Sequence, residues 1–373
     1  MSRIIIIGGG ILGASAAYHL TKKGQNVLII DRKDKGQATD AAAGIVCPWL
    51  SQRRNRAWYD LVKNGAKYYE TLIPMLEEDG EVTTGYQKVG AISLYKDQEK
   101  LIKTEKRAMQ KREDAPEIGE IKSMHIREVK KFFPELSDDY EALFVEGAAR
   151  VDGRALCNAL LNAAKNNGAK LYSGSASLLY EDRKITGALV NNQELKGEKV
   201  IVTAGAWAAE LLKPLGINLA ISSQKAQIIH LERDSENTNE HQPVIMPPND
   251  QYIVPVAANK VIIGATHENN AGFDYRVTAG GMAELLNKAL TAAPGLSTSE
   301  VTETRVGYRP FTPGFLPVIG AVPDVTGLYL ANGLGASGLT SGPYLGYQLS
   351  KLVCGEKTDI DLTRYPVSGA IIN

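Results

Sequence analysis

The first thirty residues constrain this chain most, because they read as one complete βαβ unit. Residues 3–7 are a branched apolar run, which is typical of a strand buried on both faces of a parallel sheet. Gly8-x-Gly10-x-x-Gly13 follows at once, and a helix rich in small residues is expected over 14–23. Residues 27–30 read as a second buried strand that Asp31 closes. The pattern predicts an α/β protein with a Rossmann-like sheet.

Each glycine of this motif has its own role in binding a dinucleotide. Gly8 permits the tight turn, Gly10 lets the backbone approach a pyrophosphate, and Gly13 lets the helix and strand pack closely. The N-terminus of the helix offers free N–H groups and a positive dipole end to the phosphates. Asp31, 18 residues after Gly13, can accept hydrogen bonds from ribose hydroxyls. The other contacts that we predict along this unit are Ile11, Leu12 and Arg32.

A second glycine string, Gly333 to Gly338, also matches GxGxxG and follows an apolar run at 328–331. After its helix, expected over 343–353, the chain enters a short polar tail with no second strand. The second strand of the βαβ unit that NAD binding requires is therefore missing. A helix N-terminus with glycine clearance suits another task, which is to hold the negative charge that a reduced flavin develops at N1 and the C2 carbonyl.

The rest of the chain indicates two domains that alternate along the sequence. Residues 55–140 look mostly helical and charged, with one strand expected at 91–95, and Asp152 can cap a helix that ends near Gly168. Strand-like runs follow at 175–180, 185–190 and 200–203. Those at 227–231, 252–256 and 261–265 are expected to be antiparallel, because no long helix separates them. We predict a discontinuous nucleotide domain (1–55, 145–215 and 318–373) with an inserted α+β substrate domain on an antiparallel sheet (56–144 and 216–317).

The composition excludes several other classes of protein. Lys plus Arg and Asp plus Glu both number 42, and this zero net charge argues against a nucleic-acid partner. Three widely spaced cysteines suggest reduced thiols, and the five histidines form no metal-binding pattern. No run approaches the roughly 18 apolar residues of a membrane span. The first strand begins within three residues, which leaves no room for a signal peptide. We therefore expect a cytoplasmic enzyme without a metal.

Taken in order, the motifs resemble the D-amino-acid oxidase family, in its glycine oxidase and sarcosine oxidase-like branch. The resemblance covers nearly the whole chain and is specific for the family rather than for a substrate. The segments that carry it are Gly8 to Gly13 with Asp31, Thr39-Asp40-Ala41-Ala42-Ala43-Gly44, the run Val-Ile-Val-Thr-Ala-Gly-Ala-Trp at 200–207, Gly307-Tyr308-Arg309-Pro310 with Thr312-Pro313, Leu-Pro-Val-Ile-Gly at 316–320, and Gly333 to Gly338.

The resemblance implies that the nucleotide domain binds FAD. It assigns the segment along the pyrophosphate and the flavin edge to Thr39, Ala42, Ala43 and Gly44. The turn that approaches FAD from the second part of the domain is assigned to Thr203, Ala204, Gly205 and Trp207. The loop at the flavin ring is assigned to Gly335, Ala336, Ser337, Gly338, Leu339 and Thr340. Ser177 or its neighbours would contact the adenine, and Gly307 and Arg309 would also border the cofactor. Sarcosine oxidases that attach flavin covalently use a cysteine in the segment matching 305–309. This chain has Gly307 there, so the FAD is expected to be non-covalent.

The resemblance also assigns residues to the substrate. Arg309 matches the arginine that grips the substrate carboxylate, a role for which a planar bidentate cation is suited. Tyr252 matches a tyrosine that faces the substrate. His267 lies near the position of an active-site histidine in sarcosine oxidases, about one residue out of register. Glycine oxidases carry a second arginine where this chain has Ala336 or Ser337, so strict glycine specificity is not implied.

The implied reaction is oxidation of the C–N bond of a small amino acid, namely a D-amino acid, glycine or sarcosine. Hydride passes from the α-carbon to flavin N5, and water hydrolyses the resulting imino acid to an oxo acid. No side-chain base is required, which agrees with the lack of a Ser/His/Asp set or carboxylate pair. A dehydrogenase that passes electrons to a quinone or protein partner instead of O₂, and an enzyme acting on a 2-hydroxy acid or glycerol phosphate, remain alternatives. The oligomeric state stays open, a homo-oligomer included.

Overall fold

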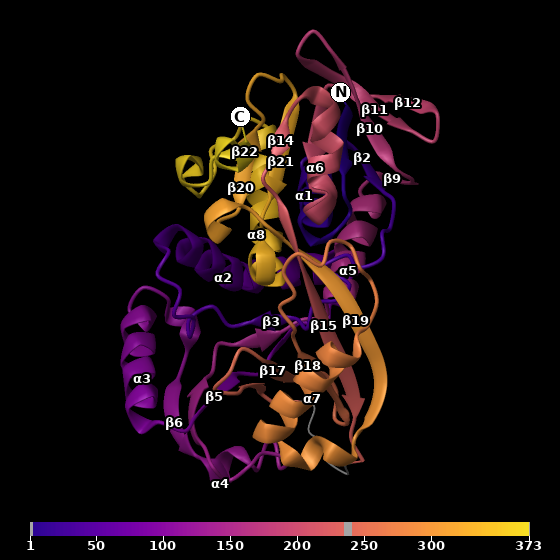
Figure 1. The fold of residues 1–373 in the computed structure, drawn as a ribbon. Helices are drawn as coiled ribbons and strands as arrows, with labels where there is room; N and C mark the ends of the chain where they lie inside the picture. The colour runs from indigo at the N-terminus through magenta and orange to yellow at the C-terminus, as the bar shows by residue number, and fades with distance from the viewer. Residues whose placement is uncertain (1–2, 235–240, 373) are drawn as a thin grey trace.

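The computed structural model describes residues 3–234 and 241–372, which form two lobes stacked one above the other (Figure 1). The upper lobe contains a mostly parallel sheet and both ends of the described chain, and the lower lobe contains a larger, mostly antiparallel sheet. Two long strands, β15 (Ser222–Glu232) and β19 (Glu300–Phe311), run from the middle of the molecule into the lower lobe. No helix in the described ranges is long and apolar enough to cross a membrane.

The sheet of the upper lobe has six strands in the order β20-β21-β13-β1-β2-β9. Every neighbouring pair is parallel except β20–β21, which is antiparallel. The Ile4 and Ile6 side chains of the first strand pack on one face, and those of Ile5 and Ile7 pack on the other. The strands are β1 (Arg3–Ile7), β2 (Asn26–Asp31), β9 (Lys170–Ser173), β13 (Lys199–Val202), β20 (Val318–Ala321) and β21 (Leu328–Asn332).

Both faces of this sheet are covered, as its continuous apolar strands require. On one face α1 (Ile11–Lys22) packs between α5 (Gly153–Asn166) and α8 (Gly338–Val353), and α2 (Arg56–Glu78) packs on α8. The other face is covered by α6 (Ala208–Leu212) and by a small antiparallel sheet of β10 (Ala176–Glu181), β11 (Lys184–Val190) and β12 (Gln193–Lys196).

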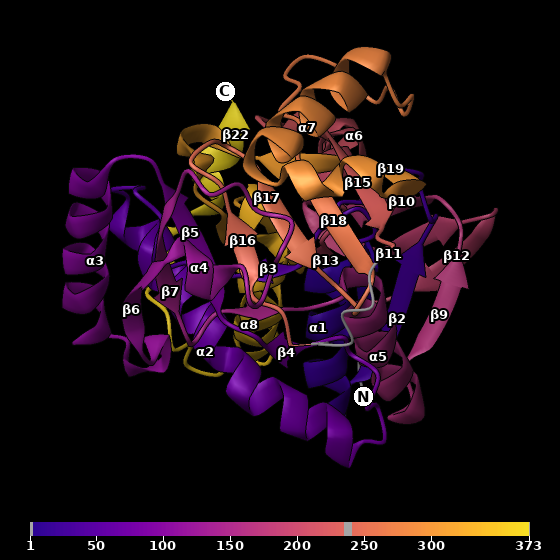
Figure 2. The same cartoon turned by 90° about the horizontal axis from the view of Figure 1, so that it is seen from below.

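The sheet of the lower lobe has eight strands in the order β19-β15-β18-β17-β16-β5-β7-β6. All of its pairs are antiparallel except β16–β5. One face of this sheet is covered by α4 (Ile126–Val129) and α7 (Ala279–Ala292). The helix α3 (Gln98–Arg112) lies along the edge formed by β7 and β6 (Figure 2). The remaining strands are β5 (Ala91–Tyr95), β6 (Ile121–His125), β7 (Glu141–Val145), β16 (Val244–Met246), β17 (Tyr252–Pro255) and β18 (Lys260–Gly264).

Short strands form two further small sheets, one of which holds a terminal segment in place. The strands β3 (Ile45–Val46) and β4 (Gln87–Lys88) both pair with β8 (Ala149–Arg150). The last described residues form β22 (Ile371–Ile372), which pairs with β14 (Asn218–Leu219).

The local predictions match the observed elements closely where the pattern was strong. The runs at 227–231, 252–256 and 261–265 lie in the antiparallel strands β15, β17 and β18. The Asp152 carboxylate accepts hydrogen bonds from the backbone N–H groups of Arg154 and Ala155, as a helix cap should. The domain boundaries themselves stay a prediction. All six strands of the upper sheet come from the ranges assigned to the nucleotide domain.

The expectation for residues 55–140 was incomplete, because this stretch contains β4 and β6 in addition to the expected strand at 91–95. The strand β6 lies at the edge of the lower sheet, and Ile121 is its only buried residue. The strand β12 was missed for the same reason, since only Leu195 is buried there. Edge strands with one buried side chain leave no apolar alternation to detect.

Candidate active site

A cavity of about 670 Å³ is bordered by residues from both lobes. At one end it is lined by the carboxyl ends of β1 and β2, where open α/β sheets bind ligands. At the other end it is lined by side chains of the lower sheet and of the segment leading into α2. The cavity therefore joins a nucleotide-binding turn to a chamber in the inserted lobe.

The turn between β1 and α1 has the geometry that its glycines predicted. Gly8 has a φ of 108°, which favours glycine, and a Cβ at Gly13 would lie 1.9 Å from the Gly8 carbonyl oxygen. The N-cap of α1 is Gly10, which has no side chain to cap the helix. The Thr39 hydroxyl accepts a hydrogen bond from the Ile11 N–H at 3.0 Å and so ties the alanine-rich segment to this turn. The first turn of α1 thus faces the cavity with room for a pyrophosphate.

The Asp31 carboxylate is buried at the end of β2 and lines the cavity. It accepts hydrogen bonds from the backbone N–H groups of Gly9 at 2.5 Å and Lys33 at 2.6 Å, and from the Gln37 side chain at 3.0 Å. These donors fix the orientation of the carboxylate. Its remaining lone pairs can accept from ribose hydroxyls, as expected from the sequence. Arg32, beside it, forms an ion pair with Asp34.

The second glycine string forms the start of α8 and also lines the cavity. Gly335 has a φ of 54°, and a Cβ there would lie 2.2 Å from the Phe311 ring. The Ser337 side chain, at the N-cap, makes no capping hydrogen bond within the described part of the chain. The positive end of this helix is consequently available to a ligand in the cavity.

Two helix ends that lack a capping N-cap side chain and a fixed Asp31 are the features that a flavin dinucleotide needs. The α1 end fits the pyrophosphate, Asp31 fits the ribose, and the α8 end fits the electron-rich edge of the ring. The residues present therefore fit FAD.

The chamber at the lower-lobe end has one strongly basic side chain, Arg309, on β19. Its Nη1 donates to the Gln224 side-chain oxygen at 3.1 Å. Tyr252 lies beside it on β17; burial raises the pKa of Tyr252, and the nearby Arg309 cation opposes that rise. Apolar side chains also line this part of the cavity, namely those of Ile45, Cys47, Pro48, Trp58, Val62 and Ile228.

His267 and Asp250 also line this chamber, near its solvent side. Burial and the Arg309 cation lower the pKa of His267. Its Nδ1 lies 3.7 Å from an Asp250 oxygen, and Asp250 also forms an ion pair with Lys288 at 2.8 Å. With His267 neutral near pH 7, Arg309 is the main positive charge facing the chamber.

The cavity brings together nearly all of the residues that the sequence predicted. Gly13 packs behind the turn rather than lining it, and Ser177 points elsewhere on β10, while its neighbours Gly174, Ser175 and Ala176 line the wall. The predicted residues that do line the cavity are Gly8, Gly10, Ile11, Leu12, Asp31, Arg32, Thr39, Ala42, Ala43, Gly44, Thr203, Ala204, Gly205, Trp207, Tyr252, Gly307, Arg309, Gly335, Ala336, Ser337, Gly338, Leu339 and Thr340.

Sequence reasoning missed the contributions of Asp250, Gln37, and α2 with the segment before it. Asp250 sits in a Pro-Pro-Asn-Asp turn that matches no binding motif. Trp58 and Val62 occupy apolar positions of an ordinary amphipathic helix. Only their position beside the cavity distinguishes them.

Comparison with known proteins agrees with this geometry. The family model described as "DAO: FAD dependent oxidoreductase" matches residues 3–352. The chain belongs to this family. It is thus an FAD-dependent oxidoreductase, and the predictions of fold class, cofactor and enzyme class are confirmed.

The relatives cover the whole chain. It is 59% identical to "uncharacterized oxidoreductase YurR" of Bacillus subtilis (strain 168), over 100% of both chains. Among solved structures it is similar to iminodiacetate oxidase (IdaA) from Chelativorans sp. BNC1, with a TM-score of 0.94, 44% identity and 98% of each chain covered. It is also similar to glycine oxidase from Geobacillus kaustophilus, with a TM-score of 0.85, 26% identity and 98% and 99% of the two chains covered.

Proposed function

We propose that this enzyme oxidises the C–N bond of a small amino acid that carries a free carboxylate. The observation that supports this most is Arg309, a guanidinium facing the chamber that adjoins the flavin-binding end of the same cavity. A carboxylate buried there without a partner would cost several kcal/mol, and a bidentate guanidinium offsets that cost.

The side chains of the chamber would bind and orient the substrate. Arg309 grips the carboxylate, and the Tyr252 hydroxyl, kept protonated by its raised pKa, donates to a substrate oxygen or accepts from its amine. The apolar wall around Trp58 and Val62 excludes water from the reacting carbon. The bound flavin supplies the hydride acceptor. Holding the α-carbon in one orientation then supports the reaction without a side-chain base.

The substrate class is supported by two relatives with different substrates in their names. One is iminodiacetate oxidase, at 44% identity, and the other is glycine oxidase, at 26% identity. We propose glycine, sarcosine and D-amino acids as candidates, together with secondary amines that carry a carboxymethyl group on nitrogen. Ala336 and Ser337, at the place of the second arginine of glycine oxidases, favour a substrate other than glycine alone.

The electron acceptor in this proposal is O₂, with a quinone as the alternative, and the location is the cytoplasm, which agrees with the free cysteines Cys47, Cys157 and Cys354. Peroxide formed in air during turnover supports an oxidase. Turnover only with an added quinone supports a dehydrogenase.

The experiment that tests the proposal is anaerobic mixing of the purified holoenzyme with candidate substrates. Glycine, sarcosine, iminodiacetate and D- and L-amino acids are each mixed with the enzyme, and loss of flavin absorbance is followed. At least one amino acid should bleach the flavin, and its amide should do so far more slowly. Equal reduction by a 2-hydroxy acid, or no preference for the acid over the amide, would refute the proposal.

A further inference from the structure

The segment 266–278, which we call the strap, connects β18 to α7 and is fastened along β15. The Lys225 and Glu268 backbones exchange two hydrogen bonds, at 3.0 and 2.9 Å. The Glu268 carboxylate accepts from the side chains of Gln227 at 2.6 Å and Thr266 at 2.7 Å. At the far end, the Thr278 N–H donates to the Gln227 side chain at 2.9 Å. The strap is therefore held at both ends by one strand.

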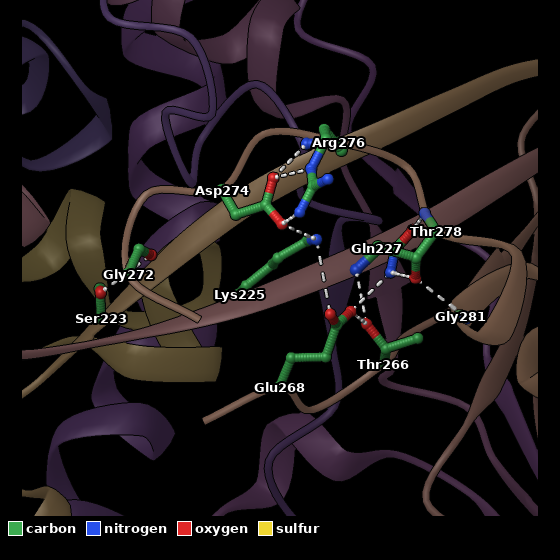
Figure 3. Close-up of polar contacts among 10 residues, drawn as sticks. All are labelled: Ser223, Lys225, Gln227, Thr266, Glu268, Gly272, Asp274, Arg276, Thr278 and Gly281. Atoms are coloured by element: carbon green, nitrogen blue, oxygen red, sulfur yellow. Dashed lines mark hydrogen bonds and ion pairs between the residues drawn. The ribbon is translucent and has the colours of Figure 1, made fainter. Parts of the chain in front are cut away.

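A buried lysine fastens the middle of the strap, as Figure 3 shows. The Lys225 side chain is 1% exposed, and its Nζ lies 3.5 Å from a Glu268 oxygen and 3.8 Å from an Asp274 oxygen. Arg276 holds the same Asp274 carboxylate at 2.9 Å. Since a buried ammonium without partners is costly, Lys225 resists any movement of the strap that would separate it from both acids.

Through Phe273, next to Asp274, the strap contacts the upper lobe. The Phe273 ring stacks on Trp207 with the centroids 5.2 Å apart and the planes 12° from parallel, and it meets Tyr308 edge-on at 5.1 Å. Trp207 and Tyr308 line the cavity, whereas Phe273 packs behind them. Tyr308 belongs to a small apolar cluster with Ala206 and Val306, and Trp207 packs against this cluster, which is separate from the larger cores.

This aromatic wall adjoins the residues that hold Asp31. The Tyr308 N–H donates to the Gly36 carbonyl at 2.9 Å, and a Cβ at Gly36 would lie 2.3 Å from the Tyr308 ring. Gln37, the next residue, donates to the Asp31 carboxylate. The wall consequently borders the nucleotide end of the cavity.

We propose that the strap is a retention device for the cofactor, in which Phe273 presses Trp207 against bound FAD and Lys225 keeps the strap in place. Trp207 is the last residue of a short 3₁₀ turn and packs against a small apolar cluster, so the Phe273 ring stacked on it helps to set its position. Loosening the strap should speed FAD release while leaving the other cofactor contacts intact. The inference requires FAD binding and no particular substrate.

The test measures the rate at which flavin fluorescence appears after the holoenzyme is diluted into buffer without FAD. Phe273→Ala should release FAD three- to tenfold faster than wild type, since a stacked aromatic pair contributes on that scale. Phe273→Tyr keeps the ring and should release FAD at the wild-type rate. Tyr275→Ala is the matched control. Tyr275 and Phe273 are both 44% exposed, but the Tyr275 ring faces Lys35 rather than Trp207. The control should change the rate less than twofold.

A double-mutant cycle tests the link between the lysine and the ring. Lys225→Met should also speed release, and adding Phe273→Ala should produce little further change, because both act through the same strap. Circular dichroism of each apoprotein verifies that the fold is retained. The proposal would be overturned if Phe273→Ala released FAD at the wild-type rate, or if Phe273→Ala and Tyr275→Ala changed the release rate equally. It would also be overturned if the effects of Lys225→Met and Phe273→Ala on that rate were independent.

Discussion

Arg309 is the side chain on which the proposed chemistry depends most, and its position is set by its neighbour across the β15–β19 pair. Gln224 lies directly opposite it in the register and accepts its hydrogen bond. The Gln224 amide also donates to Asn269 at 2.9 Å. The guanidinium is thus oriented by a neutral partner, which leaves its charge available for a substrate carboxylate.

Replacing Arg309 should affect the substrate and not the cofactor. Arg309→Ala should lower kcat/KM by about 10² or more, roughly 3 kcal/mol of lost transition-state stabilisation, and Arg309→Lys should recover only part. Gln224→Glu would set a carboxylate against the guanidinium and should raise KM. Steady-state kinetics with the best amino acid measures each effect, and flavin absorbance gives the FAD content, which should stay normal. Reduction of the Arg309→Ala flavin at the wild-type rate would make Arg309 structural.

His19 shows how burial alone can decide the charge of a side chain. It is 3% exposed between α1, α2 and α8, and its Nε2 shares a hydrogen bond with the Tyr68 hydroxyl at 2.9 Å. Burial, with help from Lys23 and Lys22, lowers the pKa of His19 from 6.5 to about 3. The histidine is therefore neutral in the folded protein throughout the physiological range.

The depressed pKa of His19 makes the folded protein less stable in acid. Below pH 6.5 the unfolded chain binds a proton that the folded chain excludes, so stability is complete above that pH and falls as the pH drops toward 3. Between pH 7.5 and 5.5 the loss should be about 1.4 kcal/mol. Urea unfolding of wild type and His19→Gln at both pH values measures it, with the exposed His125 replaced as the control. Identical pH dependence in wild type and His19→Gln would contradict this assignment.

At the scale of elements, the helices α1 and α8 are held close by small residues. A Cβ at Gly346 would lie 2.6 Å from the Ser15 Cβ, and the Ser15 hydroxyl donates to the Pro343 carbonyl at 2.6 Å. This contact sets where the N-terminus of each helix meets the cavity. Both helix ends then point toward parts of one ligand.

Adding a methyl group at this crossing should force the two helices apart. Gly346→Ala should lower the free energy of unfolding by about 1–3 kcal/mol and weaken FAD binding, because both helix ends shift. Gly280, in α7, is the comparison site, because it has no atom near its Cβ position, has no positive φ and does not line the cavity. Thermal unfolding and FAD titration of Gly346→Ala and Gly280→Ala compare the two sites. Equal stability of the two variants would show that the crossing tolerates the methyl group.

At the scale of the whole molecule, both lobes contribute walls to one cavity, so the cofactor should stabilise their arrangement. Cys47 is the cysteine in those walls, and burial raises its thiol pKa to about 12. A protonated thiol is a poor nucleophile. This supports the prediction of non-covalent FAD that Gly307 suggested.

Acid or heat should therefore release all of the yellow colour into the supernatant. The apoprotein should unfold at a lower temperature than the holoenzyme, with a difference of about 2.7 kcal/mol in stability at an FAD concentration 100 times Kd. Absorbance of the supernatant and pellet, and thermal unfolding with and without FAD, measure these two effects. Flavin that stays with the pellet in wild type but is released from Cys47→Ser would contradict the prediction.

The parts that the sequence determined by itself are those that depend on neighbours in the chain. The β1 turn, the Asp31 position, the Asp152 cap and the pairing of β15, β17 and β18 all follow from periodicity, turn chemistry and short connections. The family resemblance then assigned Arg309 to the substrate and the α8 loop to the flavin ring. Each of these signals lies within a short segment.

Only the tertiary structure decided which distant residues share the chamber and the strap. Gln224 contacts Arg309 across 85 residues, Lys225 contacts Asp274, and Phe273 meets Trp207 from the other lobe. Cys47 and His19 read as ordinary residues until their burial is known. The physical reason is that charge state, packing and cavity lining depend on atoms brought together by folding. A local pattern cannot carry that information when the partners lie in separate elements.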